Sequence, residues 1–316
     1  MTKVIDCFLY FDPINYPILE LRLNLLKDCV DYFIISEANR THSGKEIQYR
    51  LLDRLKEIGF TENNKIIYEQ VDLSNVEIQD IDRLNCAGIE NPQEFSMLAR
   101  SRERIQRDSL LNHLDKFEEN DCFIVSDADE IIDPQNIGWI KNILDNNSMD
   151  SSLVKVPLVH LEGRADLRVY VDRKPMAWDK SMFLCKKKHL QKATPTQIRS
   201  NILIPFNISY LSENNVKIED LGWHFSWMGS SEDRVLKNQS FIHNNEQIIS
   251  RVKNLGEHNE SLTEEPEENR LPPSAIKNSI LKKYDTNKLP KIILENENIR
   301  KFLLPNHQKK LYSNYY

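Results

Sequence analysis

Three acidic side chains within four residues end an apolar run near the middle of the chain. The run FIVS (123–126) leads directly into Asp127, Asp129 and Glu130. Two carboxylates separated by one residue at the end of a strand can converge on one hard divalent cation. Such a cation can bridge the oxygens of a diphosphate and neutralise the charge that builds up as the diphosphate leaves. We therefore predict that Asp127 and Asp129 bind Mn²⁺ or Mg²⁺, and that Asp127 also contacts the diphosphate-bearing donor.

Short apolar runs alternate with amphipathic stretches around this motif. The runs predict strands at 4–11, 31–38, 65–71, 121–129 and 152–161, and the amphipathic stretches predict helices at 18–29, 50–59, about 92–117 and about 134–145. This alternation is typical of an α/β fold with a mainly parallel central sheet and helices on both faces. Ligands of such sheets gather at the carboxyl ends of the strands. After about residue 150 the strands follow closely, which favours an antiparallel portion of the sheet.

Two stretches lack this rhythm. Residues 72–93 show no clear periodicity and are expected to form a surface excursion. From about residue 254 the chain is rich in Asn, Glu, Lys and Pro, and only KIILENENIRKFLLP (291–305) predicts a short docked helix. We expect a catalytic domain over residues 1–250 and a polar segment over 251–316 that packs peripherally.

Composition excludes several classes of protein. The 316 residues carry a formal net charge of -6, whereas nucleic-acid binders usually present a basic excess. No apolar window approaches the roughly 18 residues of a membrane span, and the N-terminus lacks the pattern of a signal peptide. The five cysteines are scattered and form no CxxC pair. We expect a soluble, cytoplasmic protein in a reducing compartment.

The acidic motif is one of several segments that together resemble glycosyltransferase family 17. The resemblance spans about residues 4 to 245, in the order found in the family. Its segments are DCFLYFD (6–12), LELRLNLL (19–26), DYFIISEANRTHSGK (31–45), SRERIQRD (101–108), VSDADEI (125–131), LGWHFSWMG (221–229) and KNQSFIHN (237–244).

The resemblance implies a nucleotide-sugar transferase with a GT-A-type fold that inverts the anomeric centre. The best-known family members transfer N-acetylglucosamine to N-glycans and are anchored in the Golgi membrane, an anchor that we do not find in this chain. We expect a metal-dependent glycosyltransferase that uses a UDP-sugar, first of all UDP-N-acetylglucosamine, and a glycan hydroxyl as acceptor.

The loop after the second predicted strand gathers basic side chains. Arg40, His42 and Lys45 surround Gly44 at the carboxyl end of that strand, where charged donors and backbone amides can bind phosphates. Glu37, just before the loop, could hold the loop or contact the nucleoside. The alternative is an ordinary polar turn. The family segment favours donor binding for Glu37, Arg40, His42 and Lys45.

The helix before the acidic strand carries arginines on two faces. Arg102 falls on an apolar stripe with spacing i, i+3, i+7 and i+10, shared with Phe95, Leu98 and Ile105. An arginine on an inward stripe needs an anionic partner, either a structural acid or the nucleotide. The other face reads as a solvated basic surface, formed by Arg100, Arg104 and Arg107.

A second cluster follows about a hundred residues after the aspartates. His224 lies between aromatic residues and could be a core residue or, as the family resemblance implies, a further ligand of the metal. Glu232 and Asp233 are candidates for the base that takes the proton of the acceptor hydroxyl, although acids also favour a helix N-terminus. Lys237 could approach the diphosphate.

Two other functions remain open. Haloacid-dehalogenase-like phosphohydrolases also place DxD after an apolar strand, with the first aspartate as nucleophile; here it would be Asp127. A catalytically silent carbohydrate-binding protein on the same fold is the second alternative. Metal-dependent nucleotide binding and hydrolysis of a generic phosphomonoester distinguish the three.

Overall fold

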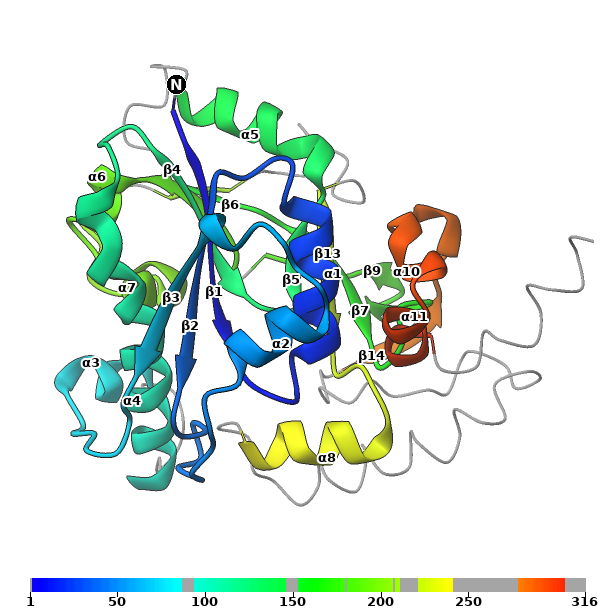
Figure 1. Cartoon of the computed structure of the whole chain (residues 1–316), viewed down its shortest axis with the longest axis horizontal. Coiled ribbons are helices and arrows are strands. Elements are labelled where there is room, and N and C mark those ends of the chain that lie inside the picture. Colours follow the sequence, from blue (N-terminus) through cyan, green and yellow to red (C-terminus); the bar gives the residue numbers. More distant parts are fainter. Residues whose placement is uncertain are drawn as a thin grey trace, which may run out of the picture.

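The computed structural model describes residues 2–86, 94–145, 153–179, 181–206, 208–210, 221–240 and 278–304. Two sheets with helices around them form this part of the chain (Figure 1). The expected domain boundary at residue 250 lies outside the described residues, as do residues 251–277 and 305–316 of the predicted C-terminal segment.

The first sheet is the α/β core that the alternation predicts. Its strand order is β12-β6-β11-β4-β1-β2-β3, and β4, β1, β2 and β3 run parallel to one another. The fold class is confirmed, with a mainly parallel central sheet. The strands are β1 (Val4–Tyr10), β2 (Tyr32–Ala38), β3 (Ile66–Val71), β4 (Cys122–Asp127), β6 (Leu153–Lys155), β11 (Phe183–Lys186) and β12 (Ile208–Tyr210).

The antiparallel portion extends the first sheet through β11, which pairs antiparallel with β4 and β6, and the later strands also build a second sheet. Its order is β14-β8-β7-β13-β5, and β9 and β10 pair with β8 and β7. The strands are β5 (Glu130–Ile132), β7 (Leu158–Glu162), β8 (Leu167–Val171), β9 (Lys174–Pro175), β10 (Ala177–Trp178), β13 (Gly222–Ser226) and β14 (Ser279–Lys283).

The single strand predicted at 152–161 is wrong. Its first part is β6 in the first sheet and its second part is β7 in the second sheet. The chain leaves the first sheet at Val156 and Pro157, and a proline has no N–H to donate to a strand ladder. This break lets one apolar run serve two sheets.

Helices cover both faces of the first sheet, as predicted. α1 (Tyr16–Leu26) and α2 (Leu51–Glu57) share one apolar cluster with β1 and β2, and α6 (Lys187–Leu190), α7 (Pro195–Ser200) and the 3₁₀ helix η2 (Ser109–Lys116) share another on the opposite face (Figure 1). The remaining helices are α3 (Asp80–Asn85), α4 (Glu94–Asp108), α5 (Pro134–Asp145), α8 (Ser231–Ser240), α10 (Lys291–Glu295), α11 (Glu297–Leu303) and the 3₁₀ helices η1 (Asn63–Lys65) and η6 (Thr286–Lys288).

Two of the less periodic stretches contain more structure than predicted. The excursion at 72–93 includes the short helix α3, which packs against α4. The stretch predicted to dock one helix forms two, α10 and α11, and both contact α1. β14 joins the edge of the second sheet next to β8.

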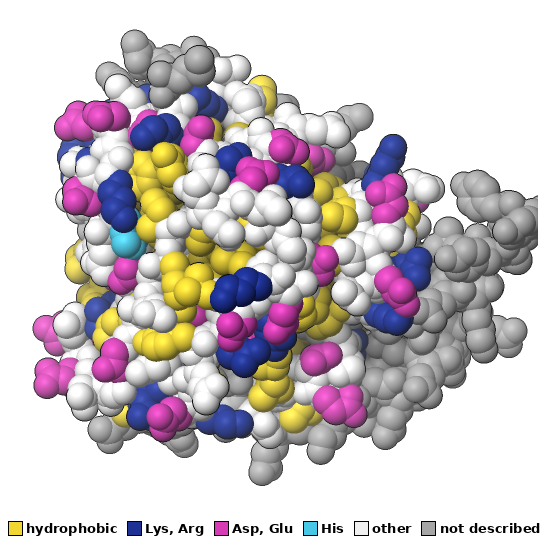
Figure 2. All heavy atoms as spheres, in the orientation of Figure 1, with side chains coloured by type: hydrophobic (Ala, Val, Ile, Leu, Met, Phe, Trp, Pro, Cys, Tyr) yellow, Lys and Arg dark blue, Asp and Glu magenta, His cyan; other side chains and the backbone are white. Residues whose placement is uncertain are grey.

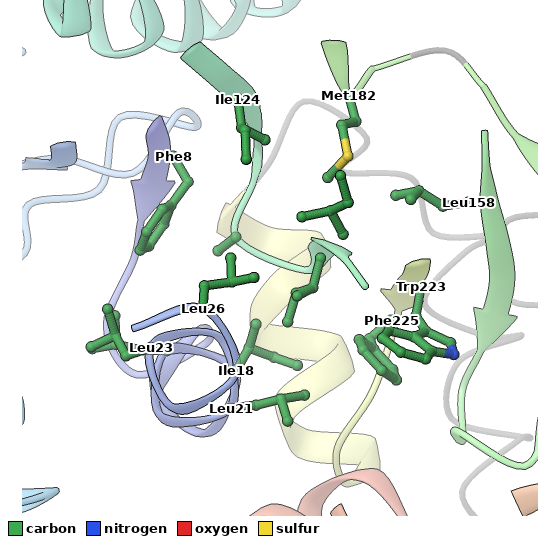
Figure 3. Packing of buried hydrophobic residues seen from close by; sticks show 14 of the residues in the cluster. Phe8, Ile18, Leu21, Leu23, Leu26, Ile124, Leu158, Met182, Trp223 and Phe225 are labelled. Carbon is green, nitrogen blue, oxygen red and sulfur yellow. The ribbon is translucent and has the colours of Figure 1, made fainter. Parts of the chain in front are cut away.

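One large apolar cluster joins the two sheets. Figure 3 shows Ile18 and Leu21 of α1 between Phe8 of β1 and Phe225 of β13. Each fully buried aliphatic or aromatic side chain of this kind contributes about 1.5–3 kcal/mol. The position of α1 is therefore fixed from both sheets at once.

Arg22, on α1, is a fully buried cation beneath the acidic turn. Its Nε and Nη2 donate to the two carboxylate oxygens of Asp6 at 2.7 and 2.6 Å, and both side chains have no exposed surface. Its other donors reach the segment that carries the acidic motif. They bind the carbonyl oxygens of Asp127 (2.8 Å), Ala128 (3.3 Å) and Glu130 (2.8 Å), and the hydroxyl of Ser126 (2.7 Å).

Replacement of Arg22 tests this arrangement. Arg22→Met leaves Asp6 buried without its partner and removes the donors of the turn, so we expect a loss of about 3–5 kcal/mol in the free energy of unfolding. Arg50→Met is the matched control, because Arg50 forms only long, half-exposed ion pairs and should cost at most about 1 kcal/mol. Urea unfolding measures both. Equal losses in the two variants would contradict the role of Arg22.

Candidate functional site

A cavity of about 230 Å³ opens at the carboxyl ends of β1 and β4. In Figure 1, β1 and β2 point toward the end of the molecule where α4 and α8 lie. Apolar walls come from Phe11, Trp178 and Trp227. Its ionisable lining residues are His42, Glu103, Arg107, Asp127, Asp129, Arg199, His224 and Lys237.

Asp127, at the end of β4, lies between two arginines. Arg107 of α4 donates to its Oδ1 at 2.8 Å, and Arg199 of α7 donates to its Oδ2 at 2.6 Å. Burial alone would raise the pKa of Asp127, but Arg199 and Arg107 outweigh burial and hold the pKa well below the usual range. Both of its oxygens are therefore occupied by guanidinium groups.

Asp129 faces the opposite wall of the cavity. Its Oδ2 lies 2.8 Å from Nζ of Lys237, and its Oδ1 lies 3.8 Å from Nε2 of His224. Burial lowers the pKa of His224 to about 4, although the charge of Asp129 acts in the other direction. The imidazole is therefore neutral at pH 7, as a metal ligand must be.

Asp129 and His224 lie close enough to share a divalent cation, whereas both carboxylate oxygens of Asp127 accept hydrogen bonds from arginines. Neighbouring ligands of an octahedral Mg²⁺ stand about 3 Å apart, so a small movement would bring Asp129 Oδ1 and His224 Nε2 onto one ion. No group of three His, Cys, Asp or Glu side chains suited to a metal exists in the described part of the chain. The assignment of Asp127, Asp129 and His224 as metal ligands stays a prediction.

The charges that line the cavity balance. The acids are Glu103, Asp127 and Asp129, and the bases are Arg107, Arg199 and Lys237. Burial would raise the pKa of Glu103, but Arg107 and His42 lower it to about 2, so this carboxylate is ionised. An anionic ligand therefore enters a cavity whose own charge is close to zero.

His42 is the one residue of the predicted basic loop that lines the cavity. Its ring packs edge-on against Phe11, and its Nε2 lies 3.1 Å from Oε1 of Gln106. Burial lowers its pKa to about 4, so His42 acts there as a neutral group. Arg40 donates to the carbonyl of Gly44 within the loop, and the side chain of Lys45 is exposed.

Glu37 anchors the start of α2 and the side chain of Tyr68 on β3, and its two predicted roles, holding the loop at 39–45 or contacting the nucleoside, stay predictions. Its carboxylate accepts hydrogen bonds from the backbone N–H groups of Arg50 (2.7 Å) and Leu51 (3.1 Å) at the start of α2, and from the hydroxyl of Tyr68. Glu37 is buried and does not line the cavity.

Arg102 of α4 holds the backbone of the basic loop through a hydrogen bond. Its Nη1 donates to the carbonyl of His42 at 3.1 Å. Gly44, with φ of +97°, lies so close that a Cβ there would stand 3.1 Å from the Arg102 guanidinium. Arg102 is half-buried and lies outside the cavity lining, and the partner observed for it is this carbonyl oxygen.

The prediction that Arg107 lies on a solvated face of α4 is wrong. Arg107 is 3% exposed and bridges Glu103 (2.9 Å) and Asp127 (2.8 Å). Arg104, also assigned to that face, pairs with the buried Asp82 at 2.8 Å. The α4 helix therefore turns Glu103 and Arg107 toward the cavity.

Glu232 and Asp233 lie in the first turn of α8, and neither residue lines the cavity of about 230 Å³. Asp233 Oδ2 accepts from the N–H and the hydroxyl of Ser230 at 2.8 and 2.9 Å, and Ser230 accepts from the N–H of Asp233. This is a helix cap, the alternative that the sequence left open. The assignment of the catalytic base to these two acids stays a prediction.

The model of glycosyltransferase family 17 matches residues 1–154, which include β1 to β4 and the acidic turn. The match covers 154 of the 316 residues. This confirms the family that the segments of the first half resemble and makes the protein a glycosyltransferase. The segments around His224 and Lys237 lie beyond the matched range.

Other comparisons add little to this assignment. A search of curated proteins found no match. Among solved structures, TarS from S. aureus is 10% identical, with 83% of this chain and 73% of that chain covered and a TM-score of 0.39. Glucosyl-3-phosphoglycerate synthase from Mycobacterium tuberculosis, in complex with Mn²⁺, UDP and phosphoglyceric acid, is 10% identical over 71% and 68% at 0.30. The bifunctional IspDF from Campylobacter jejuni is 12% identical over 70% and 54% at 0.32. TM-scores this low carry no argument about function.

Two surface properties of the glycosyltransferase bear on its partners. Positive and negative side chains are intermingled over the described residues of the face in Figure 2. None of the described helices is both long and apolar enough to cross a bilayer.

The sequence did not assign four of the residues that line the cavity to the site, namely Glu103, Arg107, Arg199 and Trp178. Glu103 and Arg107 are spaced i, i+4, a pattern typical of a helical ion pair, and this spacing could have linked them. Arg199 lies on a helix of six residues, which is too short for a periodic signal. Trp178 comes from a strand of two residues.

The buried His42 makes the stability of the glycosyltransferase depend on pH. Its pKa is about 4 in the folded state, against an ordinary 6.5. The unfolded chain therefore binds the proton first as pH falls, and the folded state loses stability through this window. From about pH 7 to about pH 4.5 the wild type should lose about 2–3 kcal/mol more than His42→Asn. Urea unfolding across this range measures the difference, and parallel pH profiles would contradict it.

Proposed function

We propose that this glycosyltransferase moves a sugar from a nucleotide-diphosphate donor to a glycan hydroxyl, with a divalent cation and with inversion at the anomeric carbon. UDP-N-acetylglucosamine is the first donor to test. The nucleotide and the sugar follow from the family alone, since a scaffold does not determine its substrate. The observation that carries the proposal is the convergence of Asp129, His224 and Lys237 at the carboxyl end of β4.

The balanced charges of the cavity support the cation. A nucleoside diphosphate adds negative charge to a cavity that is close to neutral, and Mn²⁺ or Mg²⁺ would offset it. Mg²⁺ is commonly held by one or two carboxylates together with substrate phosphates, which agrees with Asp129 and His224 as the two protein ligands. When bound, the metal would neutralise the charge on the departing diphosphate.

The chain's own residues hold the rest of the donor. Lys237 stands beside Asp129 and within 5.7 Å of the Trp227 ring centre, so its ammonium group can approach the diphosphate. The neutral His42 and Phe11 offer hydrogen-bonding and apolar contacts at the β1 side of the cavity. Trp178 donates its indole N–H to Glu130 at 2.7 Å, which fixes its ring at the cavity wall.

The two alternatives are less well supported. In a phosphohydrolase of the haloacid-dehalogenase type Asp127 would be the nucleophile, yet both of its oxygens are bound by arginines. A silent carbohydrate-binding protein would not need the pairing of Asp129 with His224. A cytoplasmic location is part of our proposal, in keeping with five cysteines that are all free.

Replacement of Asp129 tests the proposal. Asp129→Asn keeps the size of the side chain and removes its charge, so turnover should fall by at least about 100-fold, or about 2.7 kcal/mol of transition-state stabilisation. Asp115→Asn, which changes an exposed acid on η2, should keep wild-type turnover. The assay is release of UDP from UDP-sugars with manganese and a glycan mixture, after thermal-shift selection of the donor.

Three outcomes would count against the proposal. Near-normal turnover in Asp129→Asn would remove Asp129 from the mechanism. Absence of metal-dependent binding of any nucleoside diphosphate to the wild type would remove the transferase function itself. Hydrolysis of a generic phosphomonoester would favour the phosphohydrolase.

A further inference from the structure

We propose that Arg199 is a substrate-contacting residue, whose guanidinium group binds the diphosphate of the donor while Asp127 holds it in place. This inference rests on the proposed function. It adds a residue from a segment to which the sequence assigned no chemistry.

The backbone around Arg199 is held from several sides. α7 begins at Pro195 after the N-cap Thr194, whose hydroxyl accepts from the N–H of Gln197. Asp108, at the end of α4, accepts from the N–H of Thr196 at 2.9 Å. Lys155 of β6 donates to the carbonyl of Arg199 itself at 3.0 Å. α7 therefore presents this side chain from a fixed position.

One terminal nitrogen of the Arg199 guanidinium group lacks a hydrogen-bond partner among the described residues. Its Nη2 binds Asp127 at 2.6 Å, whereas its Nη1 lies 4.0 Å from Glu130 Oε2 and has no hydrogen-bond partner among the described residues. An unsatisfied buried donor on a charged group is costly. Nη1 is itself buried, so a ligand anion would meet it once the guanidinium group turns toward the cavity.

The second arginine of the cavity differs in this respect. Arg107 is 4% exposed at its side chain and is bound by both Glu103 and Asp127, whereas the side chain of Arg199 is 21% exposed. Arg107 is therefore part of the wall, and Arg199 is the guanidinium that a ligand can reach.

Asp127 makes this arrangement possible. Its Oδ1 accepts from Arg107, so its Oδ2 anchors Arg199 through Nη2 and leaves Nη1 without a hydrogen-bond partner among the described residues. Arginine suits this task because its planar fork binds phosphate oxygens in pairs. The first aspartate of the DxD motif would thus act by positioning a cation.

The contact would strengthen during the reaction. As the bond between the anomeric carbon and the diphosphate oxygen breaks, its electron pair stays on the diphosphate. The acceptor oxygen forms the new bond to that carbon, and its proton passes to a base. A cation fixed beside the diphosphate stabilises the extra charge.

The test compares UDP with uridine, each in the presence of manganese. Arg199→Met should weaken UDP binding by at least about 10-fold and leave uridine binding, followed by ligand-detected NMR, within about twofold of the wild type. Arg199→Lys keeps the charge and loses the fork, so we expect an intermediate loss for UDP alone. Lys192→Met, which removes an exposed positive charge just before α7, is the matched control and should bind UDP as the wild type does.

The outcomes separate this inference from the proposed function. If the wild type binds UDP and Arg199→Met binds it equally well, the inference is overturned and the proposed function stands. If uridine binding weakens as much as UDP binding, Arg199 is only structural and the inference is also overturned. If the wild type binds no nucleoside diphosphate, the proposed function fails and the inference fails with it. Should Arg199→Met fail to fold, Arg199→Lys decides between these results.

Discussion

The buried ion pair between Arg22 and Asp6 is the interaction on which the site depends. Both side chains are withdrawn from solvent, and the remaining donors of Arg22 bind the carbonyl oxygens of the acidic turn. A buried pair of this kind adds little net stability, but it is costly to break. It ties α1, β1 and the end of β4 together, so the turn keeps one conformation. Asp127 and Asp129 then point to opposite walls of the cavity because the backbone between them is held.

The negative charges crowded at this turn explain why basic side chains line the cavity. The two aspartates of the turn have basic neighbours from other elements: Arg107 from α4 and Arg199 from α7 beside Asp127, and Lys237 from α8 beside Asp129. The two histidines stay neutral because burial outweighs their acidic neighbours. The cavity is thus prepared for an anionic donor that brings its own cation.

The sequence predicts this site unevenly, and the reasons are physical. β1 to β4 and the acidic turn follow from local patterns of apolar residues, so they were predicted well. The prediction of one strand at 152–161 is wrong, because local periodicity cannot show that β6 and β7 join different sheets. Arg107 and Arg199 were missed because their roles depend on Asp127, which is distant in sequence from both. Of the predicted basic loop, His42 lines the cavity and Lys45 is exposed, and this difference depends on how α4 packs against the loop, which local sequence does not show.

The most direct test of the central claim is the position of manganese in a crystal grown with Mn²⁺ and UDP. Anomalous scattering at the manganese edge locates the ion without reference to any assumed chemistry. The account predicts one peak in contact with Asp129 Oδ1 and His224 Nε2, with Asp127 still bound to Arg107 and Arg199. A peak bound to Asp127 in place of its arginines, or no peak beside Asp129, would contradict it.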